Sequence, residues 1–408
     1  MAGTTIDHLV AVTIFLAAIL LFIGLFNQTI QTAILYQRHR YLATKCSDTL
    51  DNIFLNPGIP PDWGQSNASP TGFGLQDPEF TQYRVSPFSL MRLDSSTGTP
   101  VFYSKTGLYY SNTTTRFGES LLVPYNQIVN TQTAASLLGI NGSYGFSLTA
   151  TPTVNLSILE TQRSPLIVMV TATGAGYPFA YSTISYCLIK NTGNGSVYPS
   201  YTIAYGTVST DSQGVAALNL GTFDDSRESY ALIVYADTNG LVGVGSYGYS
   251  RYTDNYAVPL VSDFNSGTVL VAHSSDITGG SSSETIAYNA TFVLLTEDFT
   301  FRELLLENAT ERTGKVKTGI GQPYGTMTID TNNTGILVMS YMKESNGTDS
   351  GIILMPWGIG SMAFPVTFGD NPNYREWVAT DIRQVTVGNI AYQAKLALWS
   401  LEGYQVVS

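Results

Sequence analysis

The first 55 residues constrain the fold more than any other part of the sequence. Leu9 to Phe26 is a run of eighteen residues without a charge, and a more polar helical pattern continues to about Leu55, where Pro57 and Gly58 end it. At a rise of 1.5 Å per residue, about 50 helical residues reach roughly 75 Å. About 20 apolar residues cross the ~30 Å core of a bilayer. The apolar half therefore suffices for one membrane span, and the second half projects beyond it.

The second half of this segment carries an apolar stripe. Its members recur at spacings of three, four and seven residues, which marks one face of a helix; they are Ile30, Ile34, Leu35, Tyr41, Leu42, Cys46, Leu50, Ile53 and Phe54. Such a stripe needs a partner to pack against. The partner is either the chain's own β body or the same helix in neighbouring copies.

Beyond the helix, the sequence is rich in Gly, Ser, Thr, Asn and Tyr and predicts strands and turns. We expect a mainly β fold with one long N-terminal α-helix, shaped like a lollipop, with one or two immunoglobulin-like β-sandwich domains on a hydrophobic helical stalk. The expected divisions are a helix at 1–56, a Pro/Gly-rich turn and connector at 57–84, a β region at 85–160, an immunoglobulin- or transthyretin-like sandwich at 161–261, and a C-terminal β region at 262–408 that can complete a sandwich with 85–160.

Several local features of the β part carry their own expectations. Trp63 is expected to dock the Pro-rich turn on the body. Asn239-Gly240 is expected to form a hairpin turn, since the neighbouring residues lack the carboxylates of a calcium loop. Two further strands are expected to turn at Gly388-Asn389, and the segment 301–310 is expected to form one or two helical turns.

Ten Asn-x-Ser/Thr sequons, about twice the number expected by chance, indicate an extracellular, N-glycosylated body. Asn27 sits at the edge of the apolar run and is set aside. The candidate acceptors are Asn67, Asn112, Asn141, Asn155, Asn194, Asn289, Asn308, Asn332 and Asn346. A chain rich in Ser, Thr and Asn can also match this pattern by accident. The net charge of −11 argues against a nucleic-acid partner.

Residue types that carry catalysis are sparse. Cys46 and Cys187 are expected to be buried small hydrophobes, with a single bridge between them as the alternative. His273 falls in a predicted strand, where a packed or surface side chain is expected. The sequence shows no metal-ligand spacing, nucleophile elbow or nucleotide-binding loop. We therefore expect no enzyme, no cofactor and no catalytic or metal site, while a glycosidase acid pair drawn from distant strands stays open.

The basic residues Arg38, Arg40 and Lys45 follow the apolar run. Under the positive-inside rule they would hold the C-terminal side in the cytoplasm, whereas the sequons place the β body outside. The two signals are reconciled if the helix does not stay in a membrane.

The helix and its exit turn resemble archaeal type IV pilin-like surface proteins. The matching stretches are the apolar Leu9 to Phe26, the amphipathic Gln28 to Leu55, and SDTLDNIFLNPGIPPDWG, Ser47 to Gly64. Members of that family have a short polar N-terminus, an uninterrupted helix and a β-sandwich head, and their filaments bury the helices in a central bundle. Their leader usually carries Lys or Arg before a cleavage point, whereas only Met-Ala-Gly begins this chain; cleavage after Ala2 would make Asp7 the fifth residue, where many pilins carry a carboxylate.

The resemblance implies a structural subunit of an extracellular helical filament, membrane-inserted before assembly, with glycosylated heads outward and a role in adhesion. Its partners would be copies of itself, the membrane before or instead of assembly, and N-linked glycans. The residues expected to drive polymerisation are Leu9, Ile14, Phe15, Leu16, Ile19, Leu20, Phe22, Ile23, Phe26, Ile30, Ile34 and Leu35. The basic residues after the run are expected to pair with Asp48 and Asp51 of neighbouring copies.

Two other classes of function stay open. One is a single-pass membrane-anchored surface glycoprotein or adhesin that does not polymerise, which needs only the span and the sequons. The other is an anchored polysaccharide-active enzyme or adhesin, for which Tyr109-Tyr110 and Tyr247-Gly248-Tyr249 could supply a carbohydrate-binding surface. Sheet filling and subunit contacts are the favoured reading of these tyrosines.

Overall fold

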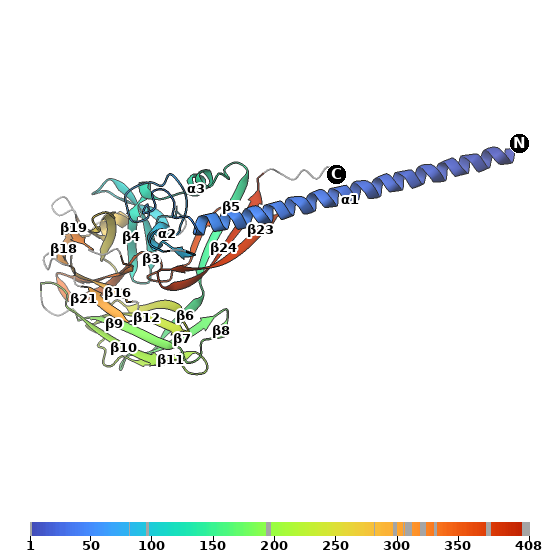
Figure 1. Ribbon diagram of the computed structural model, residues 1–408. Helices are drawn as coiled ribbons and strands as arrows, with labels where there is room; N and C mark the ends of the chain where they lie inside the picture. Colours follow the sequence, from blue (N-terminus) through green and yellow to red (C-terminus); the bar gives the residue numbers. More distant parts are fainter. Residues whose placement is uncertain are drawn as a thin grey trace.

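The computed structural model describes residues 2–80, 82–94, 98–192, 197–280, 282–296, 300–304, 306, 312–318, 324–329, 333–372 and 377–401, with side chains from residue 6 onward. A single helix, α1 (Ala2–Phe54), runs for 53 residues and projects from a multi-sheet β head (Figure 1). This confirms the expected mainly β fold with one long N-terminal helix. The helix contains no proline and only two glycines, Gly3 and Gly24, so nothing interrupts its backbone hydrogen bonds before the exit turn.

The exit turn is held by a buried tryptophan and a buried arginine. Trp63 is fully buried and donates its indole N–H to the carbonyls of Pro57 and Gly74, both at 3.1 Å, so the expected anchor is confirmed. The guanidinium of Arg92 lies 5.3 Å from that ring and donates to carbonyl oxygens of the connector and of Gln127. These bonds give the irregular connector after α1 a fixed path.

A first sheet lies along the docked end of α1, and we call it the stalk sheet. In spatial order it contains β1 (Arg84–Val85), β23 (Val378–Val387), β24 (Ile390–Ser400), β5 (Tyr144–Pro152) and β22 (Val366–Gly369). Its central strand β24 pairs with β5 along nine residues, from Tyr392↔Pro152 to Ser400↔Tyr144. The last strands of the chain therefore share a sheet with a strand from the 85–160 region.

Two further sheets complete the main body. One has the order β19 (Gly325–Thr328), β15 (Thr268–His273), β14 (Ala257–Asp263), β4 (Gly118–Pro124), β3 (Leu108–Thr115) and β2 (Gly98–Tyr103). The other has the order β17 (Phe301–Leu304), β16 (Thr285–Leu295), β20 (Gly335–Lys343) and β21 (Asn346–Trp357), with β18 (Thr313–Lys317) also on β16. Short helices α2 (Pro87–Met91), α3 (Thr131–Leu137), α4 (Ser274–Thr278) and η2 (Tyr125–Gln127) lie in the connections.

The remaining strands form a separate two-layer unit, which we call the outer sandwich. One layer is β10 (Tyr201–Ser209), β9 (Thr183–Asn191), β12 (Ser229–Thr238) and β13 (Leu241–Tyr249); the other is β11 (Val215–Asn219), β7 (Ile167–Gly174) and β6 (Val154–Gln162), with β8 (Tyr177–Pro178) on β7. Figure 1 shows it on the far side of the head from α1. Its layers enclose a core of their own that includes Val168, Leu232 and Val234.

The outer sandwich begins earlier than the sequence suggested. The expected boundary fell at residue 161, but β6 starts at Val154 and pairs with β7 from Val154↔Gly174 onward. The boundary is hard to see because β5 and β6 are separated by one residue, Thr153, whose backbone N–H donates to Ala391 at 2.9 Å. The chain therefore passes from the stalk sheet to the outer sandwich with almost no linker.

Two predicted turns are confirmed, and one predicted helix is wrong. Asn239 and Gly240 have φ angles of 52° and 82° between β12 and β13, the geometry of a tight hairpin, and Gly388 turns β23 into β24. Phe301 to Leu304 forms strand β17 rather than a helical turn, because it pairs with β16 and the Phe301 ring packs edge-on against Tyr235 at 5.0 Å. Residues 307–310 lie outside the described part of the chain.

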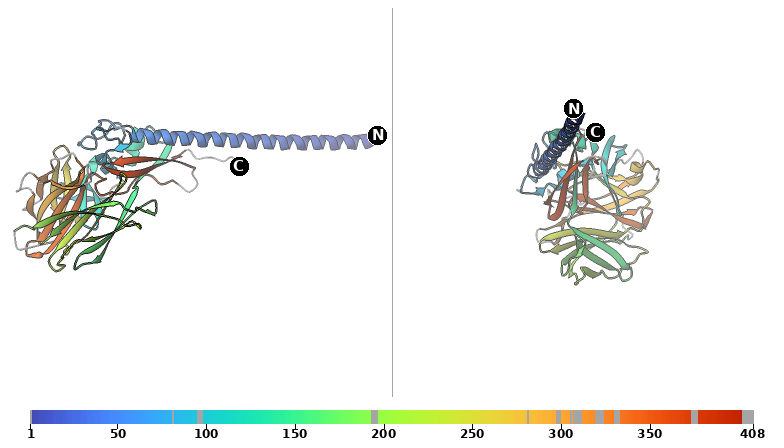
Figure 2. Two further views of the ribbon diagram at one scale, coloured as in Figure 1. Left: turned by 60° about the horizontal axis from the view of Figure 1, so that its bottom comes forward. Right: turned by 90° about the vertical axis from the view of Figure 1, so that its right-hand side faces the viewer.

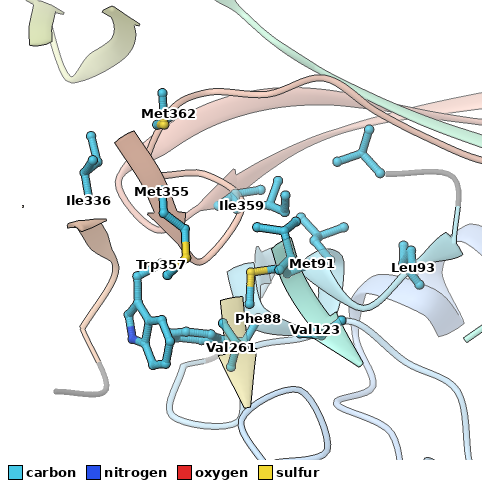
Figure 3. Close-up of a cluster of buried hydrophobic side chains, with 14 of the residues drawn as sticks. Phe88, Met91, Leu93, Val123, Val261, Ile336, Met355, Trp357, Ile359 and Met362 are labelled. Atoms are coloured by element: carbon cyan, nitrogen blue, oxygen red, sulfur yellow. The ribbon is translucent and has the colours of Figure 1, made fainter. Parts of the chain in front are cut away.

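The largest core lies where α2 meets the sheets of the main body. Figure 3 shows Phe88 of α2 beside Trp357 and Val261, with Met91 and Val123 behind it. The ring of Phe88 meets that of Trp357 edge-on, at 5.9 Å and 77°. Edge-to-face contacts of this kind add to the stabilisation from burial, so the end of the connector is fixed against the head.

Candidate assembly interface

The projecting part of α1 exposes large apolar side chains on all sides. All twelve residues expected to drive polymerisation are exposed, from 38% for Ile19 to 70% for Phe22. Figures 1 and 2 show this part of the helix leaving the head, with its N-terminus at the far end. In the described part of the chain, no element of the head covers it. An exposed apolar surface of this size marks an interaction site.

Three threonine hydroxyls of the projecting helix are bonded within the helix. The hydroxyls of Thr13, Thr29 and Thr32 donate to the carbonyls four residues earlier, at 2.8, 2.8 and 2.9 Å. A hydroxyl bonded in this way can enter an apolar environment without losing a hydrogen bond. The three threonines are therefore compatible with burial in lipid or among other helices.

The apolar stripe divides at Leu42. Leu42, Cys46, Leu50 and Ile53, spaced by three or four residues, are buried against β23 and β24, and the Cys46 sulfur lies 3.6 Å from the carbonyl oxygens of Ala379 and Leu396. The earlier stripe members stay exposed; they are Ile30, Ile34, Leu35 and Tyr41. The chain's own head is thus confirmed as the partner of the stripe from Leu42 onward, and packing of the earlier members on neighbouring copies stays a prediction.

Polar contacts fix the docked end of the helix. Both carboxylate oxygens of Asp51 accept from the Arg383 guanidinium, and Tyr83 donates its hydroxyl to the same carboxylate at 3.0 Å. The hydrogen bond of Arg383 to Asp51 raises the pKa of Arg383, and contacts of Arg383 with Tyr83 and Asp381 raise it too. Asp51 is therefore paired within its own chain, since β23 brings Arg383 across from it, and its pairing with a neighbouring copy stays a prediction.

A second contact lies nearer the point where the helix leaves the head. The imidazole of His39 stacks on the indole of Trp377, with 3.8 Å between ring centroids and 8° between the planes. Trp377 lies one residue before β23 begins. Together with Arg383 it holds α1 at two positions about three turns apart, so the direction of the projecting helix is set by the head.

Both cysteines are buried and free, as expected, and the alternative of a bridge is excluded. Desolvation by burial raises the pKa of Cys46 to about 11 and raises the pKa of Cys187 further. Both thiols are therefore neutral in the folded protein at physiological pH and pack as small hydrophobes.

The described sequons differ in exposure and in bonding. The exposed asparagines are Asn67, Asn141, Asn155 and Asn346, of which Asn67 donates its side-chain N–H to Asp263 at 2.8 Å and Asn141 to Ser136 at 3.1 Å. Asn112 is 6% exposed and donates its side-chain nitrogen to the Thr99 carbonyl at 2.6 Å, and the half-buried Asn289 donates to Pro199 at 3.0 Å. A glycan on either nitrogen would have to displace a packed contact. Asn194, Asn308 and Asn332 lie outside the described residues.

His273 and the turn carboxylate Asp224 both make local structural contacts. His273 is fully buried in β15, and its Nδ1 accepts the Ser275 backbone N–H at 3.1 Å; burial lowers its pKa. Asp224 accepts two hydrogen bonds from Ser226 in a turn, which lower its pKa. Within the described residues, no group of three or more His, Cys, Asp or Glu could hold a metal ion.

Comparisons with known proteins give no family. No family model matches the sequence, and no curated protein matches it. One solved structure with some likeness is a transglutaminase from red sea bream, at a TM-score of 0.18 and 10% identity; the match covers 62% of this chain and 40% of that one. A likeness this weak carries no argument about fold or function.

Proposed function

We propose that the chain is the structural subunit of an extracellular helical surface filament, which polymerises through the projecting part of α1 and carries its β heads outward. The observation that carries this proposal is the exposed apolar helix, unbroken from residue 2 and fixed to its own head only from about His39 onward. Copies of the same helix are a partner of matching length and chemistry.

The length of the exposed apolar surface favours other helices over lipid alone. Residues 2–41 extend about 60 Å beyond the docked end, twice the ~30 Å core of a bilayer. After Phe26 the helix continues for about 22 Å before it docks, and this stretch still exposes Ile30, Ile34 and Leu35. A lone membrane anchor leaves these side chains in water, whereas a bundle of staggered copies covers them.

The energy available is large enough for a stable polymer. Burying a large apolar side chain contributes roughly 1.5–3 kcal/mol, and twelve such side chains are exposed on the helix. The sum is on the order of tens of kcal/mol per subunit before entropy losses. Rigid docking by Arg383 and Trp377 supports the proposal too, because a stalk of fixed direction loses less freedom on assembly.

The exposed sequons are compatible with outward heads that carry N-linked glycans. Asn67, Asn141, Asn155 and Asn346 lie on different parts of the head, so an assembly through the helix leaves room for them. Adhesion is the role we assign to such a decorated surface, by analogy with other surface filaments.

A membrane-anchored glycoprotein that does not polymerise is the second candidate. Its support is the mean hydropathy of 3.0 over the most apolar eighteen residues of α1, none of which is buried in the head. This is enough for a membrane span. The same property suits a subunit that waits in the membrane before assembly.

Shearing of the cell surface separates the two candidates. Negative-stain microscopy of sheared material, with mass spectrometry of the same fraction, should find filaments composed of this chain and locate its glycans. Recovery only after detergent extraction, as single subunits, would instead establish the anchor.

A further inference from the structure

A small pocket opens where the outer sandwich meets the main body. It has a volume of about 190 Å³ and is lined by Thr183, Ser185, Thr207, Tyr235, Ala236, Asp237, Val242 and Thr300. The floor is apolar, since Tyr235 and Val242 are buried. Four Ser and Thr hydroxyls and one carboxylate make up most of the polar lining. An apolar floor with a few convergent polar groups is the usual composition of a small-molecule site.

Strand register, rather than sequence proximity, brings these side chains together. Ser185 of β9 lies directly between Thr207 of β10 and Tyr235 of β12, and two residues earlier on β9 Thr183 lies opposite Asp237. Because side chains alternate along a strand, all five share one face of the sheet. Further along the same face of β9 the side chain is Cys187, which is buried in the main core. Beyond Cys187 the polar side chain of Asn191 on this face is buried and bonded to the main body, whereas the polar side chains at the pocket line an open space.

Aromatic rings flank the pocket. Tyr205, two residues before Thr207 on the same face of β10, is 47% exposed and stacks on Phe301 with 6.4 Å between centroids. Phe301 follows the pocket residue Thr300 and packs against Tyr235. An exposed ring beside hydroxyls is suited to the apolar face of a sugar ring.

One oxygen of the pocket carboxylate is already in use. Asp237 Oδ1 accepts the backbone N–H of Gly240 at 3.0 Å, which is part of the β12–β13 turn. That bond orients the carboxylate and leaves Oδ2 for a ligand. A single carboxylate among hydroxyls is too few ligands for calcium, which takes six to eight oxygens. The negative charge of Asp237 also disfavours an anionic ligand.

We propose that this pocket binds one residue of a neutral carbohydrate. Ligand hydroxyls can donate to Asp237 and exchange hydrogen bonds with Ser185 and Thr207, which both donate and accept. The volume of about 190 Å³ is below the roughly 300–1,000 Å³ of sites that enclose a whole ligand, so one edge of a sugar ring enters while its apolar face lies near Tyr205. Recognition is weak per copy, and repetition along a filament would supply avidity.

The test uses the full chain dispersed in a detergent without a sugar headgroup. Saturation-transfer NMR with the methyl glycosides of glucose, galactose, mannose and N-acetylglucosamine should show saturable binding of at least one, with Kd in the millimolar range. Methyl glucuronide should bind at least about tenfold more weakly, because its charge meets Asp237. No transfer to any neutral glycoside at about 50 mM, or equal binding of the glucuronide, would overturn the proposal.

Two variants locate the site. Asp237→Asn keeps an oxygen for the Gly240 N–H, and Thr207→Val keeps the side-chain shape; each should weaken binding about tenfold by removing one strong hydrogen bond. Thr202→Val, on the opposite face of β10 and equally exposed, is the matched control and should bind normally. Binding that both pocket variants leave unchanged would place the sugar elsewhere. Because dispersed chains are used, this outcome is independent of whether the protein polymerises.

Discussion

The Arg383 guanidinium binds both carboxylate oxygens of Asp51, at 2.9 and 3.2 Å, across 332 positions of sequence. The pair joins the last hairpin of the chain to the helix that begins it. Its side chains are 23% and 37% exposed, so solvent screens the charges and the contribution to stability is modest. The two-point geometry makes it directional, and it sets how the helix leaves the head.

Breaking this pair should lower the stability of the helix–head junction. Arg383→Met and Asp51→Asn should each cost about 1 kcal/mol, and a double-mutant cycle should give a coupling energy of about 0.5–1.5 kcal/mol. Urea unfolding of the detergent-dispersed chain measures these changes in the free energy of unfolding. Asp48→Asn, on an exposed position of the same helix, is the control and should change nothing. Strict additivity of the two single variants would show that the contact carries no energy.

Loss of the buried arginine should loosen the connector after α1. Arg92 is fully buried and donates to carbonyls of Trp63, Ser66, Ala68 and Gln127; burial lowers its pKa to about 10. Arg92→Met leaves several acceptors unsatisfied and should destabilise the fold by about 3 kcal/mol or more. Limited proteolysis should then cut within 57–84. Arg302→Met, on a strand with that side chain exposed, should leave the digestion pattern as it is.

The pKa of the Asp263 carboxyl should depend on its hydrogen bond with Asn67, a candidate glycosylation site. Asn67 donates to Asp263 at 2.8 Å, and this bond is the main cause of the lowered pKa of Asp263. A carboxyl with a lowered folded pKa stabilises the fold above its ordinary value of 3.8, and the contribution is lost as pH falls through the folded pKa. Asn67→Ala should raise that pKa, measured by NMR titration, and should make unfolding begin at a higher pH during acidification. An unchanged pKa of Asp263 in Asn67→Ala would show that the two side chains do not bond in solution.

Both thiols should be inert in the folded protein. Burial keeps Cys46 and Cys187 neutral, and the thiolate is the reactive form. Iodoacetamide at pH 8 should label neither residue, and both should react once the chain is unfolded in guanidinium. Mass spectrometry measures the labelling. Labelling of Cys46 alone under native conditions would mean that the docked end of α1 opens from the sheet.

Local sequence signals predicted the parts of the fold that local interactions decide. The uninterrupted apolar run and Pro57-Gly58 gave the helix and its end, and Asn239-Gly240 gave a hairpin because both residues accept positive φ. Contacts between distant residues could not be seen. The insertion of β5 between β24 and β22, and the pairing that turns Phe301 to Leu304 into a strand, depend on partners elsewhere in the chain.

The sequence also could not predict which part of the apolar stripe of α1 is covered by the head. Ile34 and Leu42 belong to one stripe of the sequence, yet Leu42 is buried on the head and Ile34 is exposed. Only the position of β23 and β24 decides where the helix begins to be covered by its own head. The pocket between the outer sandwich and the main body could not be predicted from the sequence, because strand register brings Ser185, Thr207 and Asp237 together.

The most direct measurement of the central claim is filament yield in Ile34→Asp. Ile34 lies beyond the eighteen apolar residues that suffice for a membrane span, and it is 45% exposed. If copies of α1 pack on one another, a carboxylate there is buried without a partner at a cost of several kcal/mol. Sheared filaments should then disappear while the subunit remains extractable from membranes by detergent. Tyr177→Asp, on the exposed strand β8, should form filaments normally. If Ile34→Asp is displayed on the surface and released by shearing in the same way as the unaltered chain, assembly through this helix is contradicted.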